Sequence, residues 1–235
     1  MELSDWAHIH THILQLEGEG LVTRTFRRLD PERQQAILIA ILDEAAEKGP
    51  SALNVKQVAE RAGVSVGSLY TYFPNRDGML AFAIQVCVRY VTTAFDEYRP
   101  YLSAMPLRQG LAAYMIGGIE WGRMLMGLIR LFARAAYHGE PDLSETLVRP
   151  IATLLRQMVH DMLSEAAQRG EIRDDVDLGA TERIIHALTI AVGDSQLLPY
   201  LNTYFQVSDS EVPPERSLEA MVSLIMEGIG TRGPS

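Results

Sequence analysis

The sequence is poor in cysteine, in positive charge and in long apolar runs. Its 235 residues include a single cysteine, Cys87, so an internal disulfide is impossible and a disulfide-stapled secreted fold is excluded. The longest uncharged apolar stretches are too short to predict a bilayer span. Residues 1–20 carry acids and histidines where a signal peptide would need a basic start and an apolar run. We therefore expect a soluble, cytoplasmic protein.

Basic residues are outnumbered, with 21 Lys and Arg against 30 Asp and Glu and a net charge of −9. This balance argues against general adhesion to nucleic acid or to an acidic membrane. The segment from Leu21 to Arg76 has a different balance, because its eight basic and six acidic residues give it a net charge of +2. The rest of the chain then carries a net charge of −11. The difference indicates two parts with different tasks, one of which has room for a local basic face.

Helical periodicity is present along nearly the whole chain, and no run of alternating strand pattern interrupts it. Hydrophobic residues make up 47%, enough for a core without disulfides or metal. Capping or helix-opening residues (Ser4, Asp30, Asn54, Ser65 and Asn75), together with glycines and prolines, predict helices over about residues 4–18, 31–48, 54–62, 66–72, 76–98, 107–138 (split near Trp121–Gly122), 143–169, 178–204 and 215–229. We expect an all-α fold, with a small N-terminal three-helix unit and a larger C-terminal bundle.

Residues 54–72 have the pattern of two short helices joined by a tight turn. Ala59 is small where the second helix would cross, Gly63 suits a turn that needs a positive φ, and Ser65 can cap the second helix. Val64 and Leu69 are spaced to fill the wedge between the helices. The pattern predicts a helix-turn-helix, whose second helix enters the major groove of DNA. A generic α-hairpin is the alternative interpretation.

The second helix of this motif would expose small residues, hydroxyls and aromatic rings. Small residues allow close approach of the backbone to a duplex, and hydroxyls can contact phosphates or bases. Arg76, in the first turn of the next helix, is placed to meet a phosphate. The predicted DNA-binding residues are Asn54, Lys56, Ser65, Val66, Gly67, Ser68, Tyr70, Thr71, Tyr72 and Arg76.

The run from Ala59 to Arg76 resembles the signature of the tetracycline-repressor (TetR) family of bacterial regulators, and the specific likeness covers about residues 33–80. The resemblance implies a homodimeric all-helical regulator that binds a palindromic operator and is released by a small molecule. It also implies DNA contacts by Ser65, Gly67, Ser68, Tyr70 and Tyr72, with Arg76 replacing a frequent lysine.

Three positions differ from the family pattern. Val66 replaces a commonly basic residue, which removes a phosphate or base contact. Ala45 stands where phenylalanine is usual, which affects local packing, and Asn54 stands where threonine is common. Either Asn or Thr can cap the helix that follows.

The resemblance gives a division into three parts. Residues 1–29 form an N-terminal extension, with a short helix and a basic arm at Thr23–Arg28; residues 30–76 form the helix-turn-helix DNA-binding domain; residues 77–235 form the helical ligand-binding and dimerisation domain. The arm would lie along the DNA backbone or in a minor groove. A solvated linker is the alternative.

The effector site would need apolar walls with a few orienting polar groups, which large or polar residues within the C-terminal helices can supply. The candidates are Tyr114, Trp121, Met124, Phe132, Tyr137, Met158, His160 and His186. Ordinary core packing is the alternative for each of them. The sequence does not specify the ligand.

The last two long helices carry apolar residues over much of their circumference, so both sides need a cover. Family analogy pairs them with their symmetry mates in a four-helix bundle. The predicted dimer interface is Ile184, Ala187, Leu188, Ala191, Leu218, Met221, Val222 and Ile225.

No enzymatic activity, cofactor or metal is expected. His8 and His12 share a helix face at a metal-binding spacing, but no carboxylate or cysteine lies at ligand spacing. The sequence therefore predicts a homodimeric transcriptional regulator, a repressor that a small-molecule effector releases from double-stranded operator DNA. The alternatives are a helical small-molecule-binding protein or enzyme, and a dimer that binds a protein partner without operator DNA.

Overall fold

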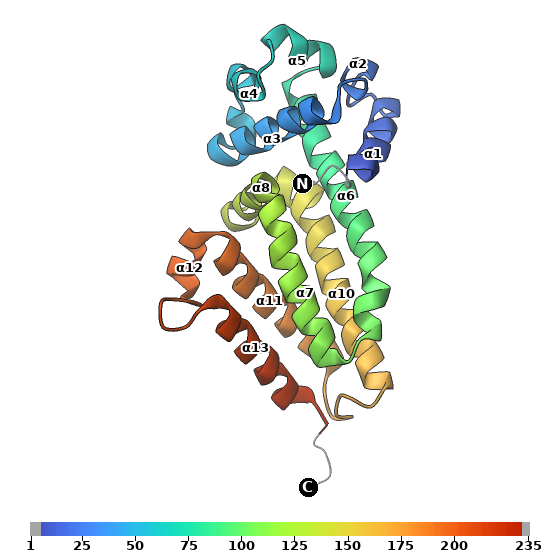
Figure 1. Ribbon diagram of the computed structural model, residues 1–235, viewed down its shortest axis with the longest axis vertical. Coiled ribbons are helices and arrows are strands. Elements are labelled where there is room, and N and C mark those ends of the chain that lie inside the picture. The colour runs from blue at the N-terminus through green and yellow to red at the C-terminus, as the bar shows by residue number, and fades with distance from the viewer. Residues whose placement is uncertain (1–5, 232–235) are drawn as a thin grey trace. The chain divides into compact units, whose positions relative to one another are not determined.

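The computed structural model describes residues 6–231, and over that range helices joined by loops make up the chain (Figure 1). Within this range there is no strand, only an isolated bridge between Ile172 and Gly230. The predicted all-α fold is confirmed. Ser4, the expected cap of the first helix, lies outside the described residues.

The chain forms two compact units, each made of two separate stretches. The first unit comprises Met1–Thr93 and Leu125–Ile151, and the second comprises Ala94–Met124 and Ala152–Ser235. The chain therefore passes from one unit to the other three times. The functional division at residue 77 follows other borders and stays a prediction.

The first unit holds the N-terminal helices and a helical segment from the middle of the chain. Its elements are α1 (Trp6–Gly18), α2 (Arg24–Arg27), α3 (Pro31–Lys48), the 3₁₀ turn η2 (Pro50–Ala52), α4 (Val55–Ala62), α5 (Val66–Tyr72), the first part of α6 (Arg76–Ala104), α8 (Met126–His138), α9 (Pro141–Leu143) and the π-helical turn η3 (Ser144–Val148). Helix α3 packs against both α4 and α8.

The predicted caps of the first unit are present. The Asp30 side chain accepts a hydrogen bond from the backbone N–H of Arg33 at 2.9 Å, and Pro31 follows it as the first residue of α3. The Asn75 side chain accepts one from the N–H of Gly78 at 2.7 Å, at the start of α6. Each bond satisfies an N–H that the helix itself leaves without a partner.

Helix α6 is longer than the sequence predicts, because it continues past Pro100 to Ala104 instead of ending near Tyr98. By length and composition alone it is long and apolar enough to cross a membrane, with a mean hydropathy of 1.4 over its most apolar window, although Arg89 keeps the uncharged stretches within it short, as expected. Half of that window is buried inside the protein, as in the core helix of a soluble protein.

The second unit is a helical bundle. Besides the end of α6 it contains α7 (Leu107–Met124), most of α10 (Arg149–Gln168), α11 (Leu178–Leu197), α12 (Pro199–Phe205) and α13 (Pro214–Ile229). Helix α7 packs against α11 and α13, and its Leu111 and Met115 lie in the same buried cluster as Ile185 and Val222.

Two predicted helices divide where the sequence did not indicate. Residues 107–138 divide at Leu125 rather than near Trp121–Gly122, whereas residues 143–169 are helical as predicted and include a π-helical turn at Ser144–Val148. The predicted helix 178–204 divides at Leu198, which has extended backbone angles (φ −126°, ψ 94°). Pro199 explains this break, because proline disfavours helical geometry at the residue before it.

Candidate nucleic-acid interface

Helices α4 and α5 form the predicted helix-turn-helix. Gly63 ends α4 in the left-handed region, at φ 66° and ψ 31°, and the N–H of Val64 donates to the carbonyl of Ala59 at 3.0 Å. Val58 and Leu69 are fully buried between the helices. The turn therefore has the glycine conformation that the sequence predicts, and it fixes the orientation of α5 on α4.

Helix α5 presents an uncharged, polar and aromatic surface. Its cap is Ser65, whose Oγ accepts from the N–H of Ser68 at 2.9 Å. Tyr70 is 54% exposed and Val66 is 38% exposed, and the Thr71 hydroxyl donates to the carbonyl of Gly67 at 3.1 Å. The exposed hydroxyls and rings thus lie on one short, well-capped helix.

No packing contact among residues 6–231 requires a glycine at position 67. It is exposed, and a Cβ added there would meet only the Ser65 Oγ, at an ordinary contact distance of 3.7 Å. A helical glycine costs about 0.5–1 kcal/mol relative to alanine. The structure thus gives no internal reason for the missing side chain.

Of the remaining predicted DNA-binding residues, Asn54, Tyr72 and Arg76 have side chains with local partners. The Asn54 side chain caps α4 by accepting from the N–H of Lys56 at 3.0 Å, while the Lys56 side chain is exposed. Tyr72 is half-buried, with its ring 6.0 Å from the ring of Phe26. Arg76 donates to the carbonyl of Ser51 at 2.8 Å and also binds the carboxylate of Asp77, so a phosphate would have to compete with that carboxylate.

The segment from Thr23 to Arg28 is not the solvated linker of the alternative interpretation, and its contact with DNA stays a prediction. It forms the short helix α2, which lies against α5 at the same end of the first unit (Figure 1). The backbone N–H of Thr23 donates to the carbonyl of Tyr72, and the Thr23 hydroxyl donates to that of Thr71, both at 2.9 Å. Phe26 is buried against Phe73 and Phe82.

An acidic pair on α3, which the sequence interpretation missed, holds α4 in place. Arg61 donates to both carboxylate oxygens of Glu47, at 3.0 and 2.6 Å, and this hydrogen bonding lowers the pKa of Glu47. The guanidinium also lies 3.3 Å from the buried carboxylate of Glu44. The i, i+3 spacing of the two acids was visible in the sequence, but the partner on the next helix was not. Arg61 is thereby less available to DNA.

The predicted effector residues divide between the two units. In the second unit, Tyr114 and Met158 are buried, Trp121 and His186 are half-buried, and Met124 and His160 are exposed. Phe132 and Tyr137 lie on α8 in the first unit. The structure thus groups six of the eight candidates in one unit.

A polar cluster around the buried Glu182 connects α10 and α11. Both oxygens of the Glu182 carboxylate are engaged at 2.5 Å, one by Arg156 and the other by Nδ1 of His160. Burial raises the pKa of Glu182, but these two partners outweigh it and the pKa is lowered overall. Nearby in sequence, burial lowers the pKa of His186, whose Nδ1 is buried without a hydrogen-bond partner.

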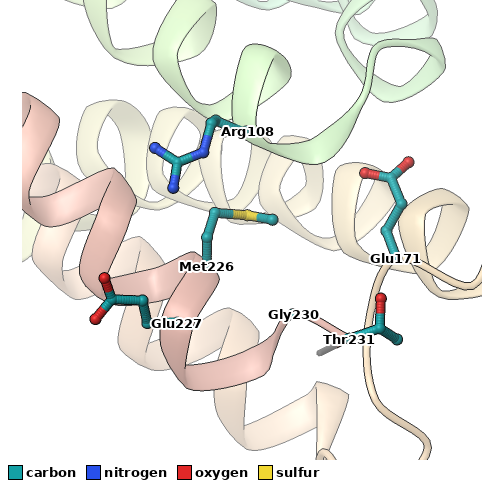
Figure 2. A pocket seen from close by; sticks show the side chains of 6 residues that line it. All are labelled: Arg108, Glu171, Met226, Glu227, Gly230 and Thr231. Atoms are coloured by element: carbon teal, nitrogen blue, oxygen red, sulfur yellow. The ribbon is translucent and has the colours of Figure 1, made fainter. Parts of the chain in front are cut away.

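A hollow of about 700 Å³ lies elsewhere in the second unit, and no predicted effector residue lines it. Figure 2 shows its lining side chains, among them Arg108, Glu171 and Met226. The Glu171 carboxylate already accepts the backbone N–H of Leu107 at 2.7 Å and binds Arg169 at 2.6 Å. The polar groups of this hollow therefore largely hold the chain itself together.

The predicted dimer residues fall into two sets. On α11, Ile184 is 63% exposed and Leu188 is 37% exposed, with Ala187 exposed and Ala191 half-buried beside them. On α13, the four predicted residues face the core of their own unit: Leu218, Met221, Val222 and Ile225. The outward apolar residue of α13 is Leu224, which is 67% exposed.

The histidine cluster gives no metal site in the described part of the chain. No group of three or more His, Cys, Asp or Glu side chains suited to a metal occurs among the described residues. His12 is buried, and its Nδ1 lies 3.5 Å from the Gln15 side-chain oxygen. The His8 side chain is outside the described part.

Residues 37–82 match the model of the family described as bacterial regulatory proteins, tetR family. This range covers most of α3, all of α4 and α5, and the start of α6. The match therefore falls on the helix-turn-helix and the helices on either side of it.

Two curated relatives match part of the chain. The HTH-type transcriptional regulator BetI of Yersinia pestis (strain Pestoides F) is 28% identical over 92 residues, which are 39% of this chain and 46% of BetI. The HTH-type transcriptional repressor KstR of Mycolicibacterium smegmatis is 45% identical over 53 residues, which are 23% of this chain and 26% of KstR. The chain thus spans less than half the length of these relatives.

A solved structure extends the likeness to most of the fold. The ketosteroid transcriptional regulator KstR2 of Mycobacterium tuberculosis superposes with a TM-score of 0.59, covering 87% of this chain and 98% of that one. The identity is 17%, so this likeness concerns the fold alone.

Proposed function

We propose that this chain is a DNA-binding transcriptional regulator of the TetR family, because residues 37–82, which hold its helix-turn-helix, match that family's model. In this proposal α5 is the recognition helix, the protein works as a homodimer in the cytoplasm, and it represses transcription from a palindromic operator. A small-molecule effector bound by the second unit releases it. TetR-family regulators are not enzymes, and we assign no catalytic site.

The observation that carries this proposal is the surface of α5. The helix is capped and held on α4, yet it leaves Tyr70 and Val66 exposed and keeps a glycine that no contact among the described residues requires. Exposed hydroxyls, rings and a bare backbone suit base edges and sugar–phosphate in a groove. A helix that served only the fold would gain stability from alanine at position 67.

Dimerisation is supported by α11, whose Ile184 and Leu188 would leave water if a second copy covered them. A two-fold dimer places two recognition helices on two half-sites, which explains how seven-residue helices reach useful affinity. Changing Ile184 to Glu should produce monomers in sedimentation velocity without unfolding the chain. Leu14, 53% exposed on α1, provides the matched control, and Leu14→Glu should remain dimeric.

An effector site in the second unit is supported by polar groups among its apolar side chains. The Tyr114 hydroxyl is buried and bonded to Thr189, and Nδ1 of His186 lacks a hydrogen-bond partner among the described residues. A buried polar atom without a partner costs about 1–3 kcal/mol, which a ligand with a matching group would recover. Apolar compounds such as ketosteroids, the class in the name of KstR2, are suitable first probes.

The chain path provides a connection between effector and operator. Helix α7 belongs to the second unit, and α8, which follows after Leu125, belongs to the first and packs against α3. A ligand that favours one arrangement of α7 would shift the population of arrangements of α8 and α3. If the ligand binds and operator affinity is unchanged, this mechanism is wrong.

The test is selection of binding sites from a random duplex library by the purified protein, at low and at near-physiological salt. Enrichment of an inverted repeat, with affinity that falls steeply as salt rises, is the expected result. Tyr70→Ala should abolish enrichment, whereas Tyr98→Ala, which removes an equally exposed ring from α6, should not. Absence of enrichment at both salts, also with candidate effectors added, would favour the protein-partner alternative.

A further inference from the structure

The recognition helix has no charge of its own, which leaves the source of phosphate binding open. The sequence of α5, from Val66 to Tyr72, contains no basic residue, and the chain as a whole carries −9. Affinity for DNA comes largely from lysines and arginines that neutralise phosphates. If α5 reads DNA, cations on neighbouring elements must supply this part of the binding free energy.

The basic residues of α4 and α6 can supply only part of this phosphate binding. Arg61 is bound by Glu47 and lies beside Glu44, and Arg76 is bound to Asp77. Among these helices, Lys56 is the basic residue near the motif that has an exposed side chain and no ion pair within the described residues.

Helix α2 carries two further cations without a carboxylate partner. Arg24 and Arg28 are exposed, and neither forms an ion pair within residues 6–231. The third arginine, Arg27, has a different role, because it is bound by Glu17 of α1. The free and the bound arginines thus lie within five consecutive residues.

The position of α2 is fixed relative to the recognition helix. Two hydrogen bonds of 2.9 Å join Thr23 to the last turn of α5, and Thr23 directly precedes Arg24. The Gln34 side chain donates to the carbonyls of Phe26 and Arg27, both at 3.1 Å, which attaches α2 to α3. Arg24 and Arg28 are therefore carried on a docked segment and not on a free arm.

We propose that Arg24 and Arg28 bind the phosphate backbone of the duplex beside the C-terminal end of α5. The contact would be independent of base sequence, and it would fix how the recognition helix enters the groove. The inference rests on the proposed function, since it concerns the same DNA. It also gives the N-terminal extension, which lies outside the matched range 37–82, a role in binding.

The test measures operator affinity against salt for Arg24→Ala/Arg28→Ala, for the Lys/Lys double variant and for Arg123→Ala. The duplex is the one selected by the wild-type protein. Removing one arginine–phosphate pair should reduce the slope of log affinity against log salt by about 0.9. In a dimer the Ala/Ala variant removes four such pairs. Between 50 and 200 mM salt the wild-type protein should therefore lose about 150-fold more affinity than this variant does.

The two control variants separate charge from structure. Lys/Lys keeps both charges and should keep the slope, because lysine also binds phosphate as a point charge. Arg123→Ala removes one exposed positive charge from α7 in the second unit, and its slope should equal that of the wild type. Thermal unfolding of all three should match the wild type, since these side chains are exposed.

Two results would overturn the inference. An unchanged slope for the Ala/Ala variant would show that α2 does not touch phosphates, and an equal loss in the Lys/Lys variant would indicate a structural effect. A wild-type protein that enriches no duplex would instead refute the proposed function, so the two failures are distinct.

Discussion

Changing Gly67 to Ala tests whether α5 is built for DNA or for the fold. The new methyl group would meet only the Ser65 Oγ at 3.7 Å, so the helix can accept it without movement. Helix propensity then favours the variant by up to about 1 kcal/mol. For a chain of this size such a gain raises the melting temperature by about 2–4 °C.

Operator binding should change in the opposite direction. If the α5 backbone at Gly67 lies against the duplex, the methyl group overpacks each half-site. Overpacking costs about 1–3 kcal/mol, which corresponds to roughly 5- to 160-fold in affinity per half-site. A stabilised protein that binds its operator more weakly is therefore the expected phenotype.

The assay pairs thermal unfolding with fluorescence anisotropy on a labelled operator. Gly63→Ala is the matched control, because Gly63 has a φ of +66° and alanine there is strained by about 1–2 kcal/mol. The control should lower the melting temperature, in contrast to Gly67→Ala. Wild-type affinity for Gly67→Ala would refute the close approach of α5 to DNA, and a lowered melting temperature would refute the packing described for this helix.

Three further predictions concern the second unit and the core. Because the pKa of Glu182 is lowered in the folded state, its contribution to stability is present above pH 4.5 and is lost as pH falls below that value. Glu182→Gln should therefore flatten the acidic part of a plot of melting temperature against pH. Because burial lowers the pKa of His186, the fold resists its protonation and loses stability as pH falls below 6.5; His186→Gln should remove this loss, and an unchanged profile would contradict the assignment. Burial raises the pKa of Cys87 to about 12, so a thiol reagent should label it only after unfolding, and rapid labelling of the native protein would contradict its burial.

Local chemistry made much of the first unit predictable. The caps at Asp30, Asn54 and Ser65 and the left-handed Gly63 lie where the sequence indicates, because each depends on atoms within a few residues. The helix-turn-helix could be predicted from the sequence for the same reason. Its constraints are short-range, and several of them coincide in one stretch of sequence.

Long-range contacts were not predictable in this way. Nothing in the sequence near Thr23 indicates that its hydroxyl bonds to the last turn of α5, and the burial of Phe26 depends on that docking. The apolar stripe of α13 was a sound prediction of burial, but it could not show that Val222 packs inside its own chain. Periodicity identifies a buried face and does not identify what covers it.

The passage of the chain between its units has a consequence for synthesis. Helix α3 is covered by α8, so closely that a Cβ on Gly127 would lie 3.2 Å from Leu42 and 3.0 Å from the carboxylate of Asp43. A nascent chain that has reached Thr93 therefore lacks part of its first unit. Domains usually fold as units during synthesis, N-terminal first. Here the DNA-binding unit is complete only once the ribosome has made Leu125–Ile151, so a fragment ending at Thr93 would expose the apolar side of α3 and aggregate.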